Sequence, residues 1–295
     1  MRQGGVLSGL FFSVYIDGLI EKVSNLKYGC KIGMLNCNII AYADDMVLLS
    51  PSAYGLKVLL DVARQEALML DLEFNLTKTK CMLFNKKRSK TRVTPVVKVA
   101  DIVIEFVSTF RYLGYIIMSD LCNSEDIARA RNKFYCDFNF VLRNFSFADV
   151  RVKLYLFRQY CLQFYGAELW FHNNNSLGSL KQLSVGYHKA IKKILSLSYH
   201  ESNHFACEQG QLFTFENLFN KMRITALLRF FTYPCNFIKK VLDYLIISSS
   251  FLNEMTEILN AKYDIHSLFE NDKDAIISRI IFVQNHERPM RERWE

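Results

Sequence analysis

Hydrophobic and polar positions alternate with two different periods in the first part of the chain. Apolar residues recur at near-helical spacing from residue 7 to 23, just after a glycine pair, which predicts a loop that leads into a helix. Two short apolar runs at residues 38–42 and 46–50 are separated by Ala43-Asp44-Asp45, and this pattern predicts a β-hairpin. A second helix is expected over residues 56–70, with Ser52 available as its N-cap.

Further along, short strand-like runs give way to long helical periods. Because the early helices and strands do not follow a simple βαβ order, we expect an α+β fold with an antiparallel sheet, followed by an all-helical part that begins near residues 120–123. The expected strands are at residues 81–84, 96–99, 102–107 and 111–117, and the expected helices at 124–144, 148–170, 176–197 and in several segments from 213 to 286.

Composition is that of a globular protein with a basic surface. Hydrophobic residues make up 51% and charged residues 22% of the 295 residues, while 12 Gly and 4 Pro argue against collagen-like and disordered classes. The net charge of +8 suggests a polyanionic partner. Between residues 75 and 100 the chain has no acidic residue to offset its basic ones, and Lys86, Lys87, Arg88 and Lys90 form the densest part of this segment. That part is expected to be a loop that follows a nucleic-acid backbone, or else an exposed basic hairpin with no ligand.

Cysteine spacing and the N-terminal apolar run both bear on the cellular environment. The 8 cysteines form no C-x-x-C pair and no zinc-like spacing with histidine, so we expect mostly buried, reduced thiols. The start of the chain resembles a signal peptide, but Asp17 and Glu21 follow at once, and no uncharged apolar run reaches the roughly 20 residues of a membrane span. We therefore expect a soluble intracellular protein without membrane contact, in either the nucleus or the cytoplasm.

The adjacent carboxylates of Asp44 and Asp45 are the main candidate for chemistry. Like charges side by side on a hairpin tip repel each other, and a divalent cation such as Mg²⁺ or Mn²⁺, bound through carboxylates and substrate phosphates, would neutralise them. The alternative is a solvated Asp-Asp turn.

Five short segments occur in a fixed order around that pair. They read RQGGVLS at residues 2–8, YADD at 42–45, NLTKTK at 75–80, FRYLG at 110–114 and FYGAELW at 164–170. Together they resemble the reverse transcriptases of non-LTR (LINE-type) retrotransposons over roughly residues 1–200. The resemblance implies RNA-directed DNA synthesis by two-metal nucleotidyl transfer, with Mg²⁺ or Mn²⁺, an RNA template, a DNA primer and deoxynucleoside triphosphates.

The resemblance also assigns roles to individual residues. Asp44 and Asp45 would be catalytic metal ligands, and the primer would be held at Tyr112, Leu113 and Gly114. The nucleotide and template would be contacted by Gln3, Gly4, Gly5, Tyr42, Ala43 and Lys78. Taken from the residues alone, Lys78 is equally a solvated lysine. Residues 112–114 are also compatible with a core strand with a glycine bulge, and a plain turn before a helix is the favoured interpretation of the glycine pair.

On the same resemblance, residues 1–120 would be part of a polymerase palm, 121–200 a helical thumb and 201–295 a helical region of unknown role. The family takes a third aspartate from a palm strand upstream of the Gln-Gly segment, in which this sequence opens. We therefore expect an open sheet edge beside the Asp-Asp hairpin and no activity from this chain by itself.

Three hypotheses remain open at the level of sequence. The chain is the C-terminal part of an active polymerase, a non-catalytic RNA- or DNA-binding remnant of a retrotransposon, or a structural or inert product with no ligand. The oligomeric state is not indicated.

Overall fold

The computed structural model describes residues 7–84, 95–99, 101–170, 177–232, 235 and 237–241. The chain divides into two compact units, one of residues 1–108 and 236–244 and the other of residues 109–235 and 245–295. Helices and short antiparallel hairpins share the first unit, and helices dominate the second, so the α+β class is confirmed. The assignment of palm, thumb and C-terminal region stays a prediction.

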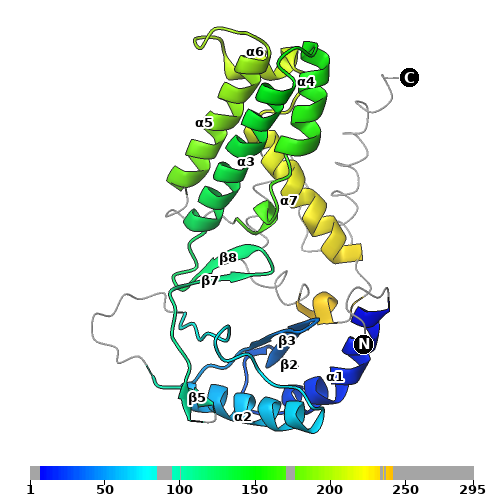
Figure 1. Cartoon of the computed structure of the whole chain (residues 1–295), viewed down its shortest axis with the longest axis vertical. Coiled ribbons are helices and arrows are strands. Elements are labelled where there is room, and N and C mark those ends of the chain that lie inside the picture. Colours follow the sequence, from blue (N-terminus) through cyan, green and yellow to red (C-terminus); the bar gives the residue numbers. More distant parts are fainter. Residues whose placement is uncertain are drawn as a thin grey trace, which may run out of the picture. The chain divides into compact units, whose positions relative to one another are not determined.

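The described residues 7–84, 95–99 and 101–108 of the first unit form two helices and three hairpins. Helices α1 and α2 pack on each other, and β3 and β4 lie against them (Figure 1). The core between them is formed by apolar side chains of both helices, including Leu19, Val23, Leu59 and Ala63. The elements are α1 (Ser8–Ser24), β1 (Lys31–Ile32), β2 (Leu35–Asn36), β3 (Ile39–Tyr42), β4 (Asp45–Leu48), α2 (Ala53–Met69), β5 (Lys98–Val99) and β6 (Ile102–Val103).

Both predicted helices of this unit are confirmed. The Ser52 hydroxyl accepts a hydrogen bond from the Gly55 amide at 3.0 Å, so Ser52 is the N-cap of α2 as expected. Helix α1 buries Ile16, Leu19 and Val23. Phe12 and Ile20 are half-buried, whereas Leu10, Phe11, Val14 and Tyr15 are exposed.

The strands predicted at residues 81–84, 96–99 and 102–107 are much shorter than expected. β5 and β6 have two residues each, and the segment at 81–84 contributes one isolated bridge between Cys81 and Phe106. Two backbone hydrogen bonds make this bridge: the Cys81 amide donates to the Glu105 carbonyl, and the Val107 amide donates to the Cys81 carbonyl, each at 2.9 Å. Apolar composition did not reveal how few backbone pairs would form, and both residues of β6, Ile102 and Val103, are exposed.

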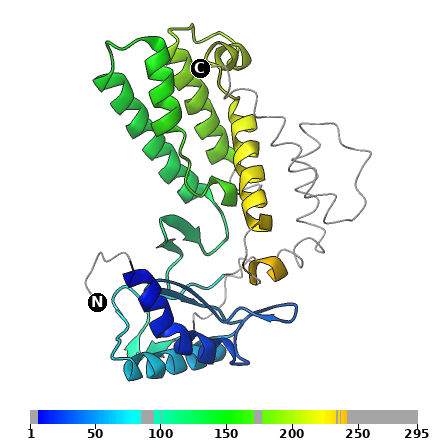
Figure 2. The ribbon, with the colours of Figure 1, turned by 90° about the vertical axis from the view of Figure 1, so that its right-hand side faces the viewer.

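The second unit begins with a hairpin and continues as packed helices (Figure 2). Helix α3 packs on α4 and α5, and α7 packs on α5. Its core is rich in aromatic side chains, among them Phe134, Phe157, Trp170 and Tyr187. The elements are β7 (Thr109–Tyr112), β8 (Tyr115–Met118), α3 (Ser124–Asn144), α4 (Val150–Leu156), a π-helical turn η1 (Phe157–Cys161), a 3₁₀ turn η2 (Ala167–Leu169), α5 (Leu177–Ile194), α6 (Asn203–Gln209) and α7 (Phe215–Thr232).

The prediction of one helix over residues 148–170 is wrong. α4 passes into η1 and ends there, and the chain then turns through Gly166, whose φ of 82° is left-handed, before the short η2. A left-handed residue cannot continue a right-handed helix, and only glycine adopts this conformation at little cost. α3 matches its prediction, α5 and α7 lie within theirs, α6 was not predicted, and the helices expected beyond residue 241 lie outside the described residues.

The expectation of reduced, buried thiols is confirmed for most cysteines. All eight are free, and Cys37, Cys81, Cys122, Cys161 and Cys207 are buried. Burial raises the pKa of the Cys161 thiol to about 12 and that of Cys207 to about 11, which keeps both neutral and unreactive. Within the described part of the chain, every helix is too short or too polar to span a bilayer.

Candidate active site

Asp44 and Asp45 lie at the tip of the β3–β4 hairpin, as predicted. The strands pair from Ile39 opposite Leu48 to Tyr42 opposite Asp45, which leaves Ala43 and Asp44 as a two-residue turn. Ala43 has a φ of 51°, a conformation that costs a residue with a Cβ roughly 1–2 kcal/mol. The turn is therefore held in a strained shape by the strands on either side, as is common at functional sites.

The two faces of this hairpin differ in their environment. Ile39, Met46 and Leu48 share one face and pack on the core formed with α1 and α2. Since side chains alternate along a strand, Tyr42 and Asp45 lie on the other face, where Tyr42 is 64% exposed. Asp45 is exposed on this open face, and Asp44 is exposed beside it in the turn.

The carboxylates of Asp44 and Asp45 have no polar partner among the described residues. Within the described ranges, no side chain or backbone group forms a hydrogen bond or an ion pair with the carboxylate of Asp44 or of Asp45. Two exposed carboxylates on one turn are suitable oxygen ligands for Mg²⁺ or Mn²⁺. No group of three or more His, Cys, Asp or Glu side chains in the described segments is arranged to hold a metal ion. The hairpin therefore offers two carboxylates, and further ligands would have to come from substrate, water or other residues.

Asn38, which the sequence analysis did not single out, fixes the base of this hairpin. Its side chain is buried, and its Nδ2 donates to the carbonyls of Val23 at 3.0 Å, Ser24 at 3.1 Å and Leu26 at 2.6 Å. Its own backbone carbonyl accepts from the Leu49 amide at 2.8 Å, which extends the β3–β4 ladder. The C-terminal end of α1 and the hairpin that carries the aspartates are thereby joined through one amide. An asparagine inside an apolar run was the only sequence feature that could have indicated this.

The β3–β4 sheet has two strands. Among the described residues no third strand pairs with either of its edges. Ile40, on the open face of β3, is 44% exposed.

Lys78 lies in a turn built by Asn75. The Asn75 Oδ1 accepts from the Lys78 amide at 3.2 Å and from the Thr77 hydroxyl at 2.6 Å. Lys78 is exposed, whereas the ammonium of the nearby Lys80 forms an ion pair with Glu105 at 2.7 Å. The turn therefore leaves the charge of Lys78 available for a ligand. No ion pair joins it to Asp44 or Asp45.

The segment predicted as a strand at residues 111–117 is instead a hairpin that turns at Leu113 and Gly114. β7 and β8 pair antiparallel, with Tyr112 opposite Tyr115. Leu113 and Gly114 both have positive φ, 46° and 84°, the pattern of a two-residue type I′ turn. The alternative of a continuous core strand with a bulge at Gly114 is therefore wrong. The alternation of apolar and polar residues predicted a single strand because a two-residue turn is too short to interrupt that pattern.

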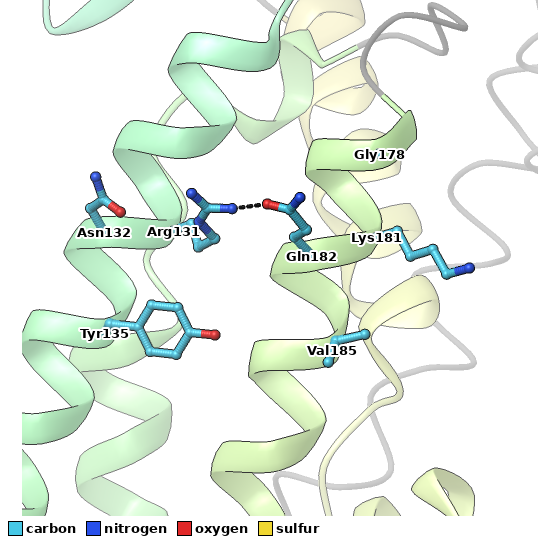
Figure 3. Close-up of a pocket in the computed structure, with 7 residues that line it drawn as sticks. All are labelled: Arg131, Asn132, Tyr135, Gly178, Lys181, Gln182 and Val185. Carbon is cyan, nitrogen blue, oxygen red and sulfur yellow. Dashed lines mark hydrogen bonds between the residues drawn. The ribbon is translucent and has the colours of Figure 1, made fainter.

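A groove of about 700 Å³ lies between α3 and α5 in the second unit (Figure 3). Two of its lining residues are cationic and none is acidic. Arg131 is directed toward α5, where its Nη1 donates to the Gln182 Oε1, while the Lys181 ammonium points away from α3 and Arg131 (Figure 3). The lining residues are Arg131, Asn132, Tyr135, Gly178, Lys181, Gln182 and Val185. Such a lining is compatible with a phosphate backbone.

Several predicted contact residues lie outside the described residues. These are Gln3, Gly4 and Gly5 of the first segment and the basic residues Lys86, Lys87, Arg88 and Lys90. Their roles stay predictions.

Comparison with known proteins identifies the part of the chain that contains the β3–β4 hairpin. Residues 1–117, which include β3, β4 and both aspartates, match the family described as reverse transcriptase (RNA-dependent DNA polymerase). This part of the chain is of the reverse transcriptase family. The chain is also similar to a protein of a non-LTR retrotransposon. Over 78 residues it is 33% identical to the Retrovirus-related Pol polyprotein from type-2 retrotransposable element R2DM of Drosophila melanogaster.

The coverage of that relative is small. The similar stretch is 26% of this chain and 7% of the Drosophila polyprotein. No solved structure matches the chain significantly. The family expected from the sequence motifs is confirmed, and the activity and partners of a whole reverse transcriptase are matters for proposal.

Proposed function

We propose that this chain takes part in RNA-directed DNA synthesis and that Asp44 and Asp45 are the metal ligands of its active site. The observation that carries the proposal is the pair of exposed, unpaired carboxylates at the tip of the β3–β4 hairpin, beside the strained residue Ala43. This hairpin lies within residues 1–117, the part that matches reverse transcriptases. Adjacent carboxylates without a partner repel each other, and a bound divalent cation removes that cost. RNA template, DNA primer and deoxynucleoside triphosphates are the corresponding partners.

In the proposed reaction the primer 3′-hydroxyl loses its proton to solvent, and its oxygen bonds to the α-phosphorus of the incoming nucleotide. The bond from that phosphorus to the bridging oxygen breaks, and pyrophosphate leaves. A bound Mg²⁺ or Mn²⁺ would supply Lewis-acid stabilisation of the charge that develops on the phosphate oxygens. The carboxylates of Asp44 and Asp45 are exposed to solvent at the tip of the β3–β4 hairpin, and the other face of this hairpin packs on the core. Lys78 offers an unpaired positive charge for the triphosphate, either to stabilise the pyrophosphate or to give it a proton.

Two carboxylates are fewer than a two-metal centre uses, and the described residues supply no third one at the hairpin. We therefore expect little or no primer extension unless a further carboxylate is supplied, either by residues outside the described ones or by another polypeptide.

Primer extension on an RNA template with Mg²⁺ or Mn²⁺ tests the catalytic claim. It compares the chain, with and without upstream reverse transcriptase sequence joined to it, with the double variant Asp44→Ala, Asp45→Ala. We expect extension with the upstream sequence and loss of extension in the double variant. Equal incorporation by the two proteins would disprove the role of the aspartates.

A non-catalytic role in nucleic-acid binding is the second candidate, and the groove with Arg131 and Lys181 favours it. Binding through phosphate contacts weakens steeply with salt, because bound counterions are released. Salt-dependent binding of single-stranded RNA without extension under any of these conditions would favour this role. If the chain does not bind RNA even at low salt, the hypothesis of a structural or inert product with no ligand would be favoured.

A further inference from the structure

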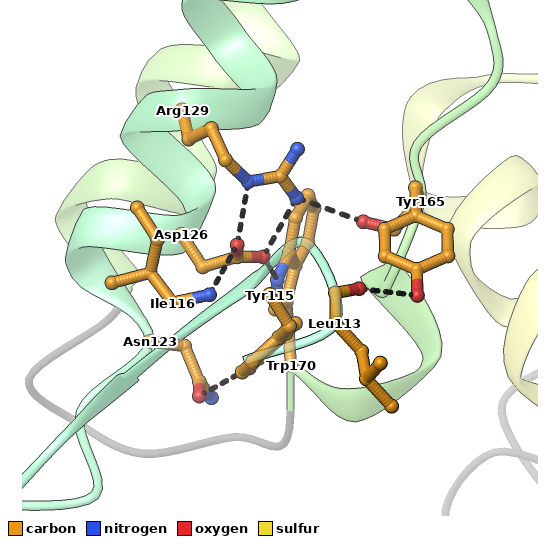
Figure 4. A network of polar contacts seen from close by, with 8 residues as sticks. All are labelled: Leu113, Tyr115, Ile116, Asn123, Asp126, Arg129, Tyr165 and Trp170. Carbon is orange, nitrogen blue, oxygen red and sulfur yellow. Dashed lines mark hydrogen bonds and ion pairs between the residues drawn. The ribbon is translucent and has the colours of Figure 1, made fainter. Parts of the chain in front are cut away.

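A buried carboxylate in the second unit connects three segments that are far apart in the sequence (Figure 4). Asp126, in the first turn of α3, is 0% exposed. It accepts from the Ile116 amide at 3.1 Å, from Arg129 Nε at 2.7 Å and Nη2 at 3.2 Å, and from the Trp170 indole Nε1 at 2.8 Å. An ionised carboxylate has about four acceptor positions, and these donors fill them.

This carboxylate does more than join helices. Burying an ion pair is often no more stabilising than apolar packing, so stability alone does not explain the buried pair of Asp126 and Arg129. The partners of Asp126 lead to the β7–β8 hairpin. Ile116 belongs to β8, and the Arg129 guanidinium also donates from Nη2 to the Tyr165 carbonyl at 3.0 Å.

Tyr165 holds the turn of the hairpin directly. Its hydroxyl donates to the Leu113 carbonyl at 2.8 Å (Figure 4). Two residues of the hairpin are thereby held, Leu113 by the Tyr165 hydroxyl and Ile116 by the Asp126 carboxylate.

Two glycines allow the hairpin and the 164–170 segment to interlock. A Cβ on Gly114 would lie 3.3 Å from Tyr165 Cε1, and a Cβ on Gly166 would lie 2.6 Å from Tyr115 Cδ2. Both glycines have a positive φ, 84° and 82°. Each segment therefore presents a glycine to a tyrosine ring of the other, which leaves the turn little freedom to change shape.

The same arrangement leaves the turn accessible. Leu113 is exposed at the tip, and the Tyr165 side chain is 60% exposed although its hydroxyl is bonded to the turn. A purely structural contact would be expected to bury both groups, whereas an exposed turn held at two points can meet a ligand without first becoming ordered.

We propose that Asp126, Arg129, Tyr165 and Trp170 form a turn clamp, a set of positioning residues that holds the Leu113–Gly114 turn in the shape in which it contacts the primer strand. This inference rests on the proposed function, because the primer is the ligand of that turn only in a polymerase. It gives the FYGAELW segment a role: Tyr165 and Gly166 contact the hairpin, and Trp170 donates to Asp126, which holds Ile116.

The test uses the full chain and the variant Tyr165→Phe, which removes only an exposed hydroxyl. Tyr160→Phe is the matched control, because Tyr160 is similarly exposed, at 62%, and its hydroxyl forms no hydrogen bond with a described residue. Two quantities are measured for each protein: amide hydrogen exchange over residues 110–117, and affinity for a DNA primer annealed to an RNA template, by fluorescence anisotropy.

We expect Tyr165→Phe to speed exchange in the hairpin and to weaken primer–template binding by roughly three- to tenfold, the usual effect of one hydrogen bond. Tyr160→Phe should change neither quantity. Unchanged hairpin exchange in Tyr165→Phe would overturn the clamp. Faster exchange with unchanged affinity would overturn its role in positioning a primer contact.

A second variant reports on the buried end of the clamp. Asp126→Asn replaces one acceptor oxygen by a donor that faces Arg129 and Trp170, so the indole N–H resonance of Trp170 should shift. In a Trp294→Phe background Trp170 is the single tryptophan, since the chain has 2. An unshifted resonance would contradict the clamp. If the unaltered chain binds no primer–template, the proposed function fails, and the exchange and resonance measurements still decide the clamp.

Discussion

Replacing Asn38 by alanine should loosen the hairpin that carries Asp44 and Asp45. The two amide hydrogens of Asn38 serve three carbonyls at the end of α1. Val23 and Ser24 keep other donors, the Leu26 amide and the Asn36 side chain respectively, but no other described group donates to the Leu26 carbonyl.

The expected loss follows from those contacts. Two hydrogen bonds contribute about 1 kcal/mol each, and the Leu26 carbonyl, which is partly buried, loses its donor, so the free energy of unfolding should fall by about 2–3 kcal/mol. The Asn38 Oδ1 is buried without a partner among the described groups, so its removal adds nothing to the cost. Asn36→Ala, which removes one exposed bond of 3.2 Å to the Ser24 carbonyl, should cost less than about 0.5 kcal/mol.

Amide hydrogen exchange is the suitable assay, because neither tryptophan lies in the described part of the first unit and fluorescence would not report on it. The Leu49 amide, which donates to the Asn38 carbonyl, should exchange roughly 30- to 150-fold faster in Asn38→Ala. Exchange within about twofold of the unaltered chain would refute the view that Asn38 anchors this hairpin.

Two further predictions concern the second unit. Gly166→Ala should lower the free energy of unfolding by about 2–4 kcal/mol in a denaturant titration followed by tryptophan fluorescence, because alanine is strained at a φ of 82° and its Cβ would displace the Tyr115 ring. Gly178→Ala, where a Cβ meets nothing within 4 Å, should leave it unchanged or raise it slightly, and equal losses in both variants would contradict this reasoning. Burial lowers the pKa of His188, whose Nε2 accepts from the Phe215 amide at 3.4 Å, so the folded state prefers the neutral ring and its contribution to stability should be complete above about pH 6.5 and decline as the pH falls below it. His188→Gln should flatten that part of a stability–pH curve, and an unchanged slope would show that another group titrates.

Local pattern was sufficient for the elements that carry strong periodicity. Helix α2 was predictable because its apolar residues keep one face and Ser52 caps it, and the β3–β4 hairpin because two apolar runs flank a short acidic turn. In both cases residues close in sequence determine the structure.

The remaining features depend on contacts between distant segments. The helix predicted across residues 148–170 ends at Cys161, and the chain then turns through Gly166, where the ring of Tyr115 occupies the space of a Cβ. The roles of Asn38 and Asp126 could not be predicted from the sequence. A single polar residue in an apolar run, such as Asn38, is common, and an acidic residue in the first turn of a helix, such as Asp126, is usual there. Their roles follow from the carbonyls, amides and indole that the fold brings to them.

Motifs located the candidate site more securely than they described its surroundings. Tyr42, Ala43, Asp44 and Asp45 lie on the predicted turn. Leu113 and Gly114 were singled out as primer contacts through the family resemblance, while strand alternation placed them inside a single strand. Positive φ at both residues is a property of the backbone that only the hairpin geometry reveals.

Direct measurement of Mn²⁺ binding tests the central claim that Asp44 and Asp45 are metal ligands, without requiring activity. Electron paramagnetic resonance of free Mn²⁺ would be followed during titration of the chain, of Asp44→Asn with Asp45→Asn, and of Asp71→Asn as a control that removes another exposed, unpaired carboxylate of the first unit. We predict that the unaltered chain and Asp71→Asn deplete free Mn²⁺ equally and that the double variant binds at least roughly tenfold more weakly. Equal binding by all three proteins would contradict the claim.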